Sequence, residues 1–202
     1  MSKYVIRLKA PFNVIHKQQY TDNNCVEIVE DNFGIIRFSA TEKEAIDTYI
    51  PKTNDVIPLA CWLSKPNKVK KQLENVGVWL APEDDPYLLS DLISNNGIAT
   101  PATIAIDFPT WKDGRGYSHA YIIRQRLNWT GELRAVGDVL RDQIKFMARS
   151  GITVFAPNNC KEEVLMDALK AFSEFKLHYQ GDNWQPKPYF HSRNNIKSAN
   201  IN

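Results

Sequence analysis

Four short apolar segments in the second half of the chain constrain its fold more than any other feature. Each of them is too short for a helix and is rich in β-branched or aromatic residues, which is typical of a buried strand. They are VGVWLA (76–81), ATIAIDF (102–108), ELRAVGD (132–138) and ITVFA (152–156). Because the strands of a parallel sheet are buried on both faces and are therefore almost uniformly apolar, these segments predict a parallel sheet.

Segments with helical periodicity separate these strands. In the clearest of them, Leu140, Ile144 and Met147 fall on one helix face. The predicted helices cover residues 86–94, 118–127, 139–150 and 161–175. Strand–helix alternation predicts an α/β fold in which four consecutive βα units are joined by right-handed crossovers. The pattern leaves open whether the units form an open sheet or part of a barrel.

The N-terminal part of the chain predicts β structure of a different kind. Residues 4–8 alternate in polarity, and residues 26–40 contain two β-rich runs on either side of a turn with Asn32 and Gly34. A glycine that can adopt a positive φ in such a short turn predicts a β-hairpin. We therefore expect a β-rich extension over residues 1–54, an α/β domain over 55–180 and a surface tail over 181–202.

Composition and charge exclude several classes of function. The chain has 25 Lys and Arg against 23 Asp and Glu, and its formal charge of +2 is too small for binding nucleic acid by bulk electrostatics. No apolar run is long enough to span a membrane, and the N-terminus lacks the apolar core of a signal peptide. We therefore expect a cytoplasmic protein with neither nucleic acid nor a membrane as its partner.

Cysteine and histidine residues are too dispersed to indicate a metal site. The three cysteines form no C-x-x-C pair, and the four histidines do not show the spacing of metal ligands. No motif for a cofactor is evident, although flavin and nicotinamide remain open. Cys160 follows the last predicted strand, where a helix start can lower the pKa of a thiol, but no histidine lies nearby in sequence to serve as its base.

The densest group of candidate residues follows the second predicted strand. Ligands of parallel α/β sheets bind beyond the carboxyl ends of the strands, and residues 113–118 place two glycines around Arg115 at this point. Glycine allows the backbone N–H groups to form an anion-binding nest, Ser118 is the expected N-cap of the next helix, and arginine is a bidentate donor. These features predict a site for a small oxyanion or a nucleotide. The alternative is a tight turn in which Arg115 pairs with Asp107 or Asp113.

Polar residues at the other strand ends favour structural roles. Arg134 lies within the third predicted strand, where a buried guanidinium is costly unless it is paired, and Asp107 and Asp138 are its candidate partners. Gly137 allows a sharp turn, and Asp138 is expected to cap the following helix. After the first strand, an acidic metal site is the alternative to an N-cap role for Asp85, which the following proline favours.

The candidate ligand-binding residues come from the ends of the second and third strands. They are Asp107, Asp113, Gly114, Arg115, Gly116, Tyr117, Ser118, Arg134, Gly137, Asp138 and Arg141. Residues 110–150 contain eight Lys or Arg and four Asp or Glu, which favours an anionic ligand, an acidic partner surface or a solvated helical face. No catalytic residue is identified.

Three blocks of sequence, at residues 107–109, 113–118 and 131–143, resemble the signature of a bacterial family of unknown function, DUF934. The similarity extends over about residues 55–192 and includes the apolar run at 56–63, which we expect to pack on the main body. The resemblance implies a role in assimilatory sulfite reduction toward cysteine, as an accessory or component protein that acts with the sulfite reductase hemoprotein or its electron donor. It implies no catalytic residue, so an oxidoreductase activity remains open.

Two other interpretations stay open beside this one. In the first, an enzyme or sensor binds a small oxyanion or a nucleotide through residues 113–118. In the second, the protein is a scaffold without a ligand, and its charged residues only fix the geometry of the sheet. Replacing Arg115 would remove a ligand-induced stabilisation in the first case and would lower the folding stability in the second.

Overall fold

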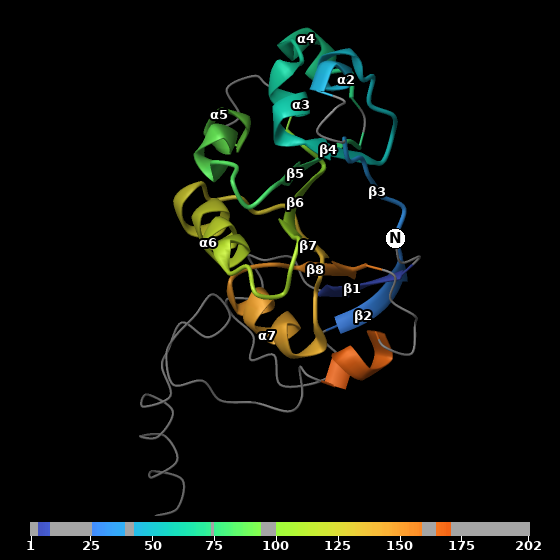
Figure 1. The fold of residues 1–202 in the computed structure, drawn as a ribbon, viewed down its shortest axis with the longest axis vertical. Coiled ribbons are helices and arrows are strands. Elements are labelled where there is room, and N and C mark those ends of the chain that lie inside the picture. Colours follow the sequence, from blue (N-terminus) through green and yellow to red (C-terminus); the bar gives the residue numbers. More distant parts are fainter. Residues whose placement is uncertain are drawn as a thin grey trace, which may run out of the picture.

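The computed structural model describes residues 4–8, 26–38, 43–73, 75–93, 100–158 and 165–170. These residues form a mixed α/β fold around one eight-stranded sheet that is open and strongly curled, and Figure 1 shows helices along the outer side of the curl. The predicted tail at 181–202, Cys160, and the predicted helix at 161–175 apart from residues 165–170 lie outside the described residues. None of the described helices combines the length and the apolar character needed to cross a membrane.

The strands lie in the sheet in the order β2-β1-β8-β7-β6-β5-β4-β3. Their bounds are β1 (Tyr4–Leu8), β2 (Val26–Glu30), β3 (Gly34–Ile35), β4 (Asp55–Pro58), β5 (Gly77–Leu80), β6 (Thr103–Phe108), β7 (Glu132–Gly137) and β8 (Val154–Pro157). The helices are α2 (Lys43–Thr48), α3 (Leu59–Ser64), α4 (Asn67–Lys70), the 3₁₀-helix η2 (Pro86–Leu89), α5 (Ser90–Ile93), α6 (Arg115–Tyr121), the π-helix η3 (Ile122–Arg126) and α7 (Arg141–Arg149). Residues 165–170 are also helical.

The sheet is mixed, so the prediction of a purely parallel sheet is wrong. Strands β3 to β8 are parallel to one another, whereas β1 is antiparallel to both β8 and β2. The four strands predicted from the apolar segments correspond to β5, β6, β7 and β8. Four βα units do not describe the whole sheet. The parallel strands β4 and β3 lie beyond β5 at one edge, and at the other edge β1 lies between β8 and β2 and is antiparallel to both.

The predicted hairpin over residues 26–40 is also wrong. Strands β2 and β3 lie at opposite edges of the sheet, and β3 pairs with β4, where Ile35 lies opposite Val56. A flat sheet of this size would be about 34 Å wide, whereas the residues that link β2 to β3 can span only about 14 Å. The sheet must therefore curl until its two edges approach each other, and residues 26–36 lie along both of them.

The apolar run at 56–63 packs on the main body as predicted, but it is divided between a strand and a helix. It contributes the end of strand β4 and then most of helix α3, which begins directly after Pro58. Val56 and Ile57 are buried in the sheet, and Trp62 is buried beneath the helix. A short apolar run of this kind is compatible with either strand or helix, and here it supplies both.

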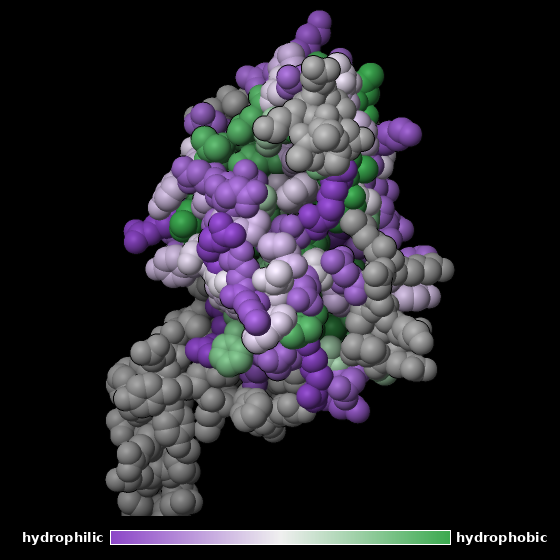
Figure 2. Space-filling view, viewed as in Figure 1, coloured by the Kyte–Doolittle hydropathy of each residue, from purple (hydrophilic) through white to green (hydrophobic). Residues whose placement is uncertain are grey.

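The outer face of the sheet carries the main core. Successive residues of a strand point to opposite faces, and on this side Ile104, Ile106 and Phe108 of β6 pack with residues of the covering helices, including Ala120 and Met147. Full burial of an aliphatic or aromatic side chain contributes about 1.5–3 kcal/mol. In the space-filling view of Figure 2, the hydrophobic side chains left on the surface form small groups among hydrophilic ones.

The concave inner face has a much smaller apolar cluster. Its fully or almost fully buried members are Val56, Ala105 and Val136, and partly buried hydrophobic residues pack against them. The remaining space on this face is taken by charged side chains, which are described below. The helices thus cover the outer face of the sheet, and the charged side chains lie on its concave face.

Candidate functional site

The carboxyl ends of β5 to β8 form the edge at which ligands bind in parallel sheets. We call residues 109–115, which follow β6 at this edge, the rim segment. We call the ion pairs on the concave face the inner ion pairs, and they involve Arg7, Asp31, Arg37, Asp107, Glu132 and Arg134. The predicted site residues lie in or beside one of these two places, except for Arg141, which pairs with Asp167.

Arg115 is exposed on the rim segment and pairs with Asp113. The carboxylate accepts hydrogen bonds from the backbone N–H of Arg115 at 3.1 Å, from Nε at 3.0 Å and from Nη2 at 2.7 Å. These hydrogen bonds lower the pKa of Asp113 and raise the pKa of Arg115. The tight turn considered above is thus present, and within the described residues Nη1 of Arg115 donates no hydrogen bond.

The backbone around Arg115 differs from the predicted nest. Helix α6 begins at Arg115 with Gly114 as its N-cap residue, so the prediction that Ser118 caps this helix is wrong. The N–H groups of Arg115 and Tyr117 donate to Asp113 and to the Gly114 carbonyl, so they are already satisfied within the turn. Gly114 has an ordinary φ of −82°. An anion at this place would therefore be held by side chains and not by a backbone nest.

Glycine has a packing role at the next position of this turn. A Cβ atom on Gly116 would lie 2.5 Å from the ring of Phe108, so glycine lets α6 approach β6 closely. Tyr117 then packs edge-to-face on the same ring, with 5.6 Å between the centroids. Burial raises the pKa of the Tyr117 hydroxyl. These contacts fix the start of α6 against the strand that precedes it.

Hydrogen bonds to the segment after β7 hold the rim segment in place. The backbone N–H of Trp111 donates to Asp138 at 2.9 Å, and Gln143 donates to the Trp111 carbonyl at 2.7 Å. The Trp111 ring is nevertheless 50% exposed, and the Lys112 ammonium lies 5.3 Å from its centroid. The predicted capping role of Asp138 is wrong, because α7 begins only at Arg141.

The turn after β7 needs glycine. Gly137 has a φ of +104°, and a Cβ atom there would lie 2.4 Å from the carbonyl oxygen of Phe108. The prediction that Gly137 allows a sharp turn is confirmed. The predicted N-cap role of Asp85 is confirmed as well, since its carboxylate accepts the N–H of Tyr87 at 2.9 Å with Pro86 at the first position of η2.

Asp107 of the central strand β6 points into the curl and pairs with a residue that lies beside the β3 edge of the sheet. Both of its oxygens accept hydrogen bonds from Arg37, which follows β3, at 2.6 and 2.8 Å. The Arg37 guanidinium lies 5.0 Å from the centre of the Trp79 ring, and the hydrogen bond to Asp107 raises its pKa. Asp107 was one of two candidate partners for Arg115 and one of two for Arg134, and among the described residues it pairs with neither of them.

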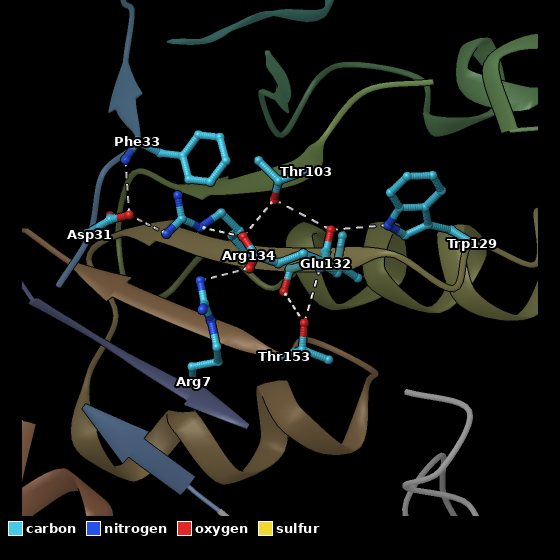
Figure 3. Close-up of polar contacts among 9 residues, drawn as sticks. Arg7, Asp31, Phe33, Thr103, Trp129, Glu132, Arg134 and Thr153 are labelled. Atoms are coloured by element: carbon cyan, nitrogen blue, oxygen red, sulfur yellow. Dashed lines mark hydrogen bonds and ion pairs between the residues drawn. The ribbon is translucent and has the colours of Figure 1, made fainter. Parts of the chain in front are cut away.

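Arg134 is completely buried on the concave face, and Figure 3 shows its surroundings. Its Nη2 atom lies 2.6 Å from Asp31 and its Nε atom 3.3 Å from Glu132, while its guanidinium stacks 4.8 Å from the centre of the Phe33 ring. The prediction of a structural ion pair for Arg134 is confirmed, but its partners are not Asp107 or Asp138. The acidic partner comes from the link between β2 and β3, because the curl brings this link across the sheet.

Glu132 extends this network toward the amino ends of the strands. Arg7 of β1 donates to one of its carboxylate oxygens at 3.2 Å, and the Thr103 hydroxyl donates to the other at 3.1 Å (Figure 3). The three arginines of the inner ion pairs are thus matched by three carboxylates. A cavity next to Asp31 and Arg37 has a volume of about 10 Å³, roughly the room of one water molecule. It is lined by Asp31, Ile35, Arg37, Val136, Ala156, Pro157 and Asn158.

His119 is a candidate functional residue that the sequence analysis missed, whereas Asp84 belongs to the acidic stretch after the first predicted strand, where a metal site was the alternative to a helix start. His119 is only 7% exposed, its Nδ1 atom is buried without a hydrogen bond among the described residues, and burial lowers its pKa. Asp84 follows β5 and accepts the N–H of Ala81 at 2.7 Å, and burial raises its pKa. The spacing of residues could have identified His119 from the sequence. It lies four positions after Arg115, which places the two residues on the same side of a helix.

The predicted site residues do not surround one point. Asp113 to Ser118 lie at the rim, and Asp138 joins them through Trp111. Asp107 and Arg134 belong to the inner ion pairs, and Arg141 pairs with Asp167 at 2.9 Å. Within the ranges that the structure covers, no group of three or more His, Cys, Asp or Glu is arranged to hold a metal ion.

One family model matches residues 77–190, which is more than half of the chain, and its description is a bacterial protein of unknown function (DUF934). The matched interval contains β5 to β8, the rim segment and Arg134. It does not contain Arg7, Asp31 or Arg37, so each of the inner ion pairs at these residues joins a matched residue to one outside the match. Among curated proteins, none matches the chain.

Proposed function

The chain belongs to the bacterial family DUF934, and from this premise we propose that it is an accessory or component protein of assimilatory sulfite reduction in the cytoplasm. It acts with the sulfite reductase hemoprotein or with the electron donor of that enzyme. Support for the pathway comes from the resemblance of residues 107–109, 113–118 and 131–143 to the family signature. We assign the rim segment as the surface that contacts the partner.

The observation that carries this assignment is an exposed but fixed group of side chains. Trp111 is half exposed, Lys112 lies over its ring, and the Arg115 side chain is 57% exposed. Tryptophan and arginine dominate the binding energy of many protein interfaces. Because hydrogen bonds to Asp138 and Gln143 already hold the backbone of this segment, docking would lose little conformational entropy.

The charge of the rim segment indicates an acidic partner surface. It contains Lys112 and Arg115 against Asp113 alone. Exposed charges of this kind act mainly on the rate of association and on the choice of partner, and salt screens them. Binding should therefore weaken as the ionic strength rises.

The test is complex formation between the full chain and the purified hemoprotein, and separately its electron donor. Gel filtration and calorimetry at low salt should detect a complex at micromolar concentration. Trp111→Ala should weaken it at least tenfold, which corresponds to about 1.4 kcal/mol. Arg126→Ala is the matched control, because Arg126 is exposed on η3 outside the rim segment. Absence of any complex, or equal effects of the two substitutions, would contradict the proposal.

A bound cofactor would change the role from accessory protein to redox component. The absorbance spectrum of the protein as purified separates these two roles, since a flavin or heme band would identify a redox component.

A second candidate function is the binding of a small oxyanion at the rim. It is favoured by one observation, namely that Nη1 of Arg115 and Nδ1 of His119 have no hydrogen bond among the described residues. A ligand at a hundred times its dissociation constant raises the free energy of unfolding by about 2.7 kcal/mol. Thermal unfolding with sulfite or phosphate should show this stabilisation, and Arg115→Ala should remove it while Arg126→Ala retains it.

A further inference from the structure

Helices α3 and α4 carry a local excess of positive charge. Residues 63–71 contain four lysines and no Asp or Glu, and we call them the basic surface. Lys68 and Lys71 are exposed on it. Lys65 donates to the backbone carbonyls of Ile46 and Asp47 at 3.3 and 2.7 Å, so it has no carboxylate as its partner.

Lys70 is a nearly buried lysine without a partner. Its side chain belongs to a residue that is 5% exposed, and its ammonium forms neither a hydrogen bond nor an ion pair with the residues that the structure describes. Burial lowers its pKa, because no nearby carboxylate offsets the loss of water. Lysines that are buried to this degree are almost always paired. Lys70 therefore calls for a carboxylate from another molecule.

The segment that follows β5 has the opposite charge. Residues 72–111 contain no Lys or Arg. Asp85 and Asp91 are exposed at the start of η2 and in α5, and we call residues 85–91 the acidic surface. Glu83 is exposed as well, but it lies close enough to Arg115 to raise the pKa of that guanidinium. The acidic surface is therefore defined without it.

Both surfaces also expose large apolar side chains. On the basic surface, Leu63 and Val69 are 40% and 37% exposed. On the acidic surface, Tyr87 and Leu88 are 49% and 51% exposed. Figure 2 shows hydrophobic side chains near α3 and α5 with hydrophilic ones around them. Apolar side chains surrounded by charged ones are typical of a protein–protein interface.

The basic and acidic surfaces are neighbours on the outer face of the sheet. Strands β4, β5 and β6 are parallel and adjacent. Helices α3 and α4 connect β4 to β5, whereas η2 and α5 connect β5 to β6. Right-handed crossovers place both connections on the same face of the sheet, and Figure 1 shows α3, α4 and α5 on one side of it. Neighbouring surfaces of opposite charge are complementary to a second copy that is related by a two-fold axis.

We propose that two copies of this chain form a two-fold symmetric dimer, in which the basic surface of each copy contacts the acidic surface of the other. Lys70 pairs with a carboxylate of the second copy, and the exposed apolar side chains of the two surfaces pack together. Each contact then occurs twice. The rim segment is part of neither surface, so this inference goes beyond the function proposed above.

A protein partner fits the basic surface better than nucleic acid or a membrane. Residues 63–71 contain neither an arginine, which suits bidentate contacts with phosphate, nor an exposed aromatic ring on which a base could stack. Helices α3 and α4 are six and four residues long, which is too short for an amphipathic helix that lies on a membrane. Carboxylates of a second copy provide the required charge.

The experiment is sedimentation velocity of the full chain over a range of micromolar concentrations, at low and at high ionic strength. The protein should show a monomer–dimer equilibrium that shifts toward the monomer as salt rises. Lys70→Met keeps the buried stem but removes the charge, and it should weaken the dimer at least tenfold. Arg126→Met is the matched control, because it removes an exposed charge outside both surfaces, and it should leave the dimer unchanged.

Exchanging charges provides a second measurement at exposed positions, where folding is not at risk. Asp91→Lys should prevent dimer formation, and so should the combination of Lys68→Glu with Lys71→Glu. A mixture of these two proteins should form a dimer again, because each altered surface then faces one of opposite charge. This measurement still decides the question if Lys70→Met does not fold.

Four results would overturn the inference. They are a chain that stays monomeric at every concentration, equal effects of Lys70→Met and Arg126→Met, a mixture that does not dimerise, and growth into longer oligomers, which a closed two-fold contact forbids. A monomer that binds a DNA oligonucleotide or phosphatidylserine vesicles through Lys70 would assign the basic surface to those ligands instead. Complex formation with the hemoprotein is measured separately, with substitutions in the rim segment.

Discussion

The rim segment and the concave face both pair arginine with aspartate, but the two pairs differ in origin and in surroundings. Asp113 and Arg115 are two residues apart in sequence, and the Arg115 side chain is mostly exposed. Asp31 and Arg134 are 103 residues apart, and their side chains are 8% and 1% exposed. Water screens the first pair and weakens it, whereas the second has no water to replace its partner.

This difference separates a surface available for binding from an interior that holds the fold. Two of the inner ion pairs connect the central strands β6 and β7 with the chain between β2 and β4. They hold this chain, which runs from one edge of the sheet to the other, against the middle of the sheet. The pair on the rim only orients one side chain within its own turn. Substitutions should therefore affect stability on the concave face and binding at the rim.

The largest effect on stability is expected for Arg134→Ala. Removing the guanidinium leaves Asp31 buried without its partner, and breaking a buried pair in this way costs about 3–5 kcal/mol. Urea denaturation followed by circular dichroism measures the free energy of unfolding. Arg115→Ala is the control and should leave that free energy almost unchanged. A similar value for both variants would remove the distinction between the two regions.

A smaller loss is expected for Gly137→Ala. The positive φ and the approach to the Phe108 carbonyl both oppose a Cβ atom, and a backbone conformation of this kind costs about 1–3 kcal/mol when a side chain is forced into it. Gly114→Ala is the matched control, because a Cβ atom there would meet nothing within 4 Å. The difference between their midpoints of urea denaturation tests whether the turn after β7 requires glycine.

Arg37→Ala should lower the free energy of unfolding by about 1–2 kcal/mol, less than Arg134→Ala. The Arg37 guanidinium is partly exposed, so solvent screens its pair with Asp107. The loss should be larger than for Arg126→Ala, which removes an exposed arginine that no inner ion pair uses. Hydrogen exchange of the β3 and β4 amides should also become faster, because this pair holds that edge against β6. Unchanged exchange rates of these amides would show that the ion pair does not stabilise the β3 edge of the sheet.

The smallest effect is a pH dependence due to His119. Its pKa is lower in the folded than in the unfolded protein, so the unfolded state binds more protons as the pH falls below the usual histidine value of 6.5. Stability should therefore decrease from about pH 6.5 downward, by at most about 1.4 kcal/mol per pH unit for one proton. His119→Gln should reduce this slope in urea denaturation between pH 5 and 7 (a range chosen around about 6.5). An equal slope in both proteins would mean that the imidazole titrates as if it were exposed.

Features that depend on neighbouring residues were predictable from the sequence. Strands β5 to β8 appear as apolar runs because both of their faces are buried, and Asp85 caps η2 because its acceptor and the N–H of Tyr87 are close in sequence. The need of Arg134 for a partner followed from its position in a buried strand. The pairing of Arg115 with Asp113 was one of two alternatives that the sequence left open.

Features that depend on distant residues were not predictable. The turn at residues 31–34 has the same composition whether it closes a hairpin or crosses from one edge of a curled sheet to the other, and only the second brings Asp31 to Arg134. Partners for Asp107 were sought among residues of the same half of the chain, whereas Arg37 comes from the N-terminal part of the chain and lies beside the edge strand β3. His119 was one of four dispersed histidines in the sequence, and only the fold showed that its Nδ1 atom is buried without a hydrogen bond among the described residues.

The sequence by itself thus determined where the chain extends into buried strands, which residues needed partners, and the family to which it belongs. The tertiary structure alone decided how the sheet curls, which charges meet inside it, and that Nδ1 of His119 is enclosed without a hydrogen bond among the described residues. The physical reason is that burial and local hydrogen bonding leave a pattern in consecutive residues. Contacts across a curled sheet depend on strand order, which no short stretch of sequence records.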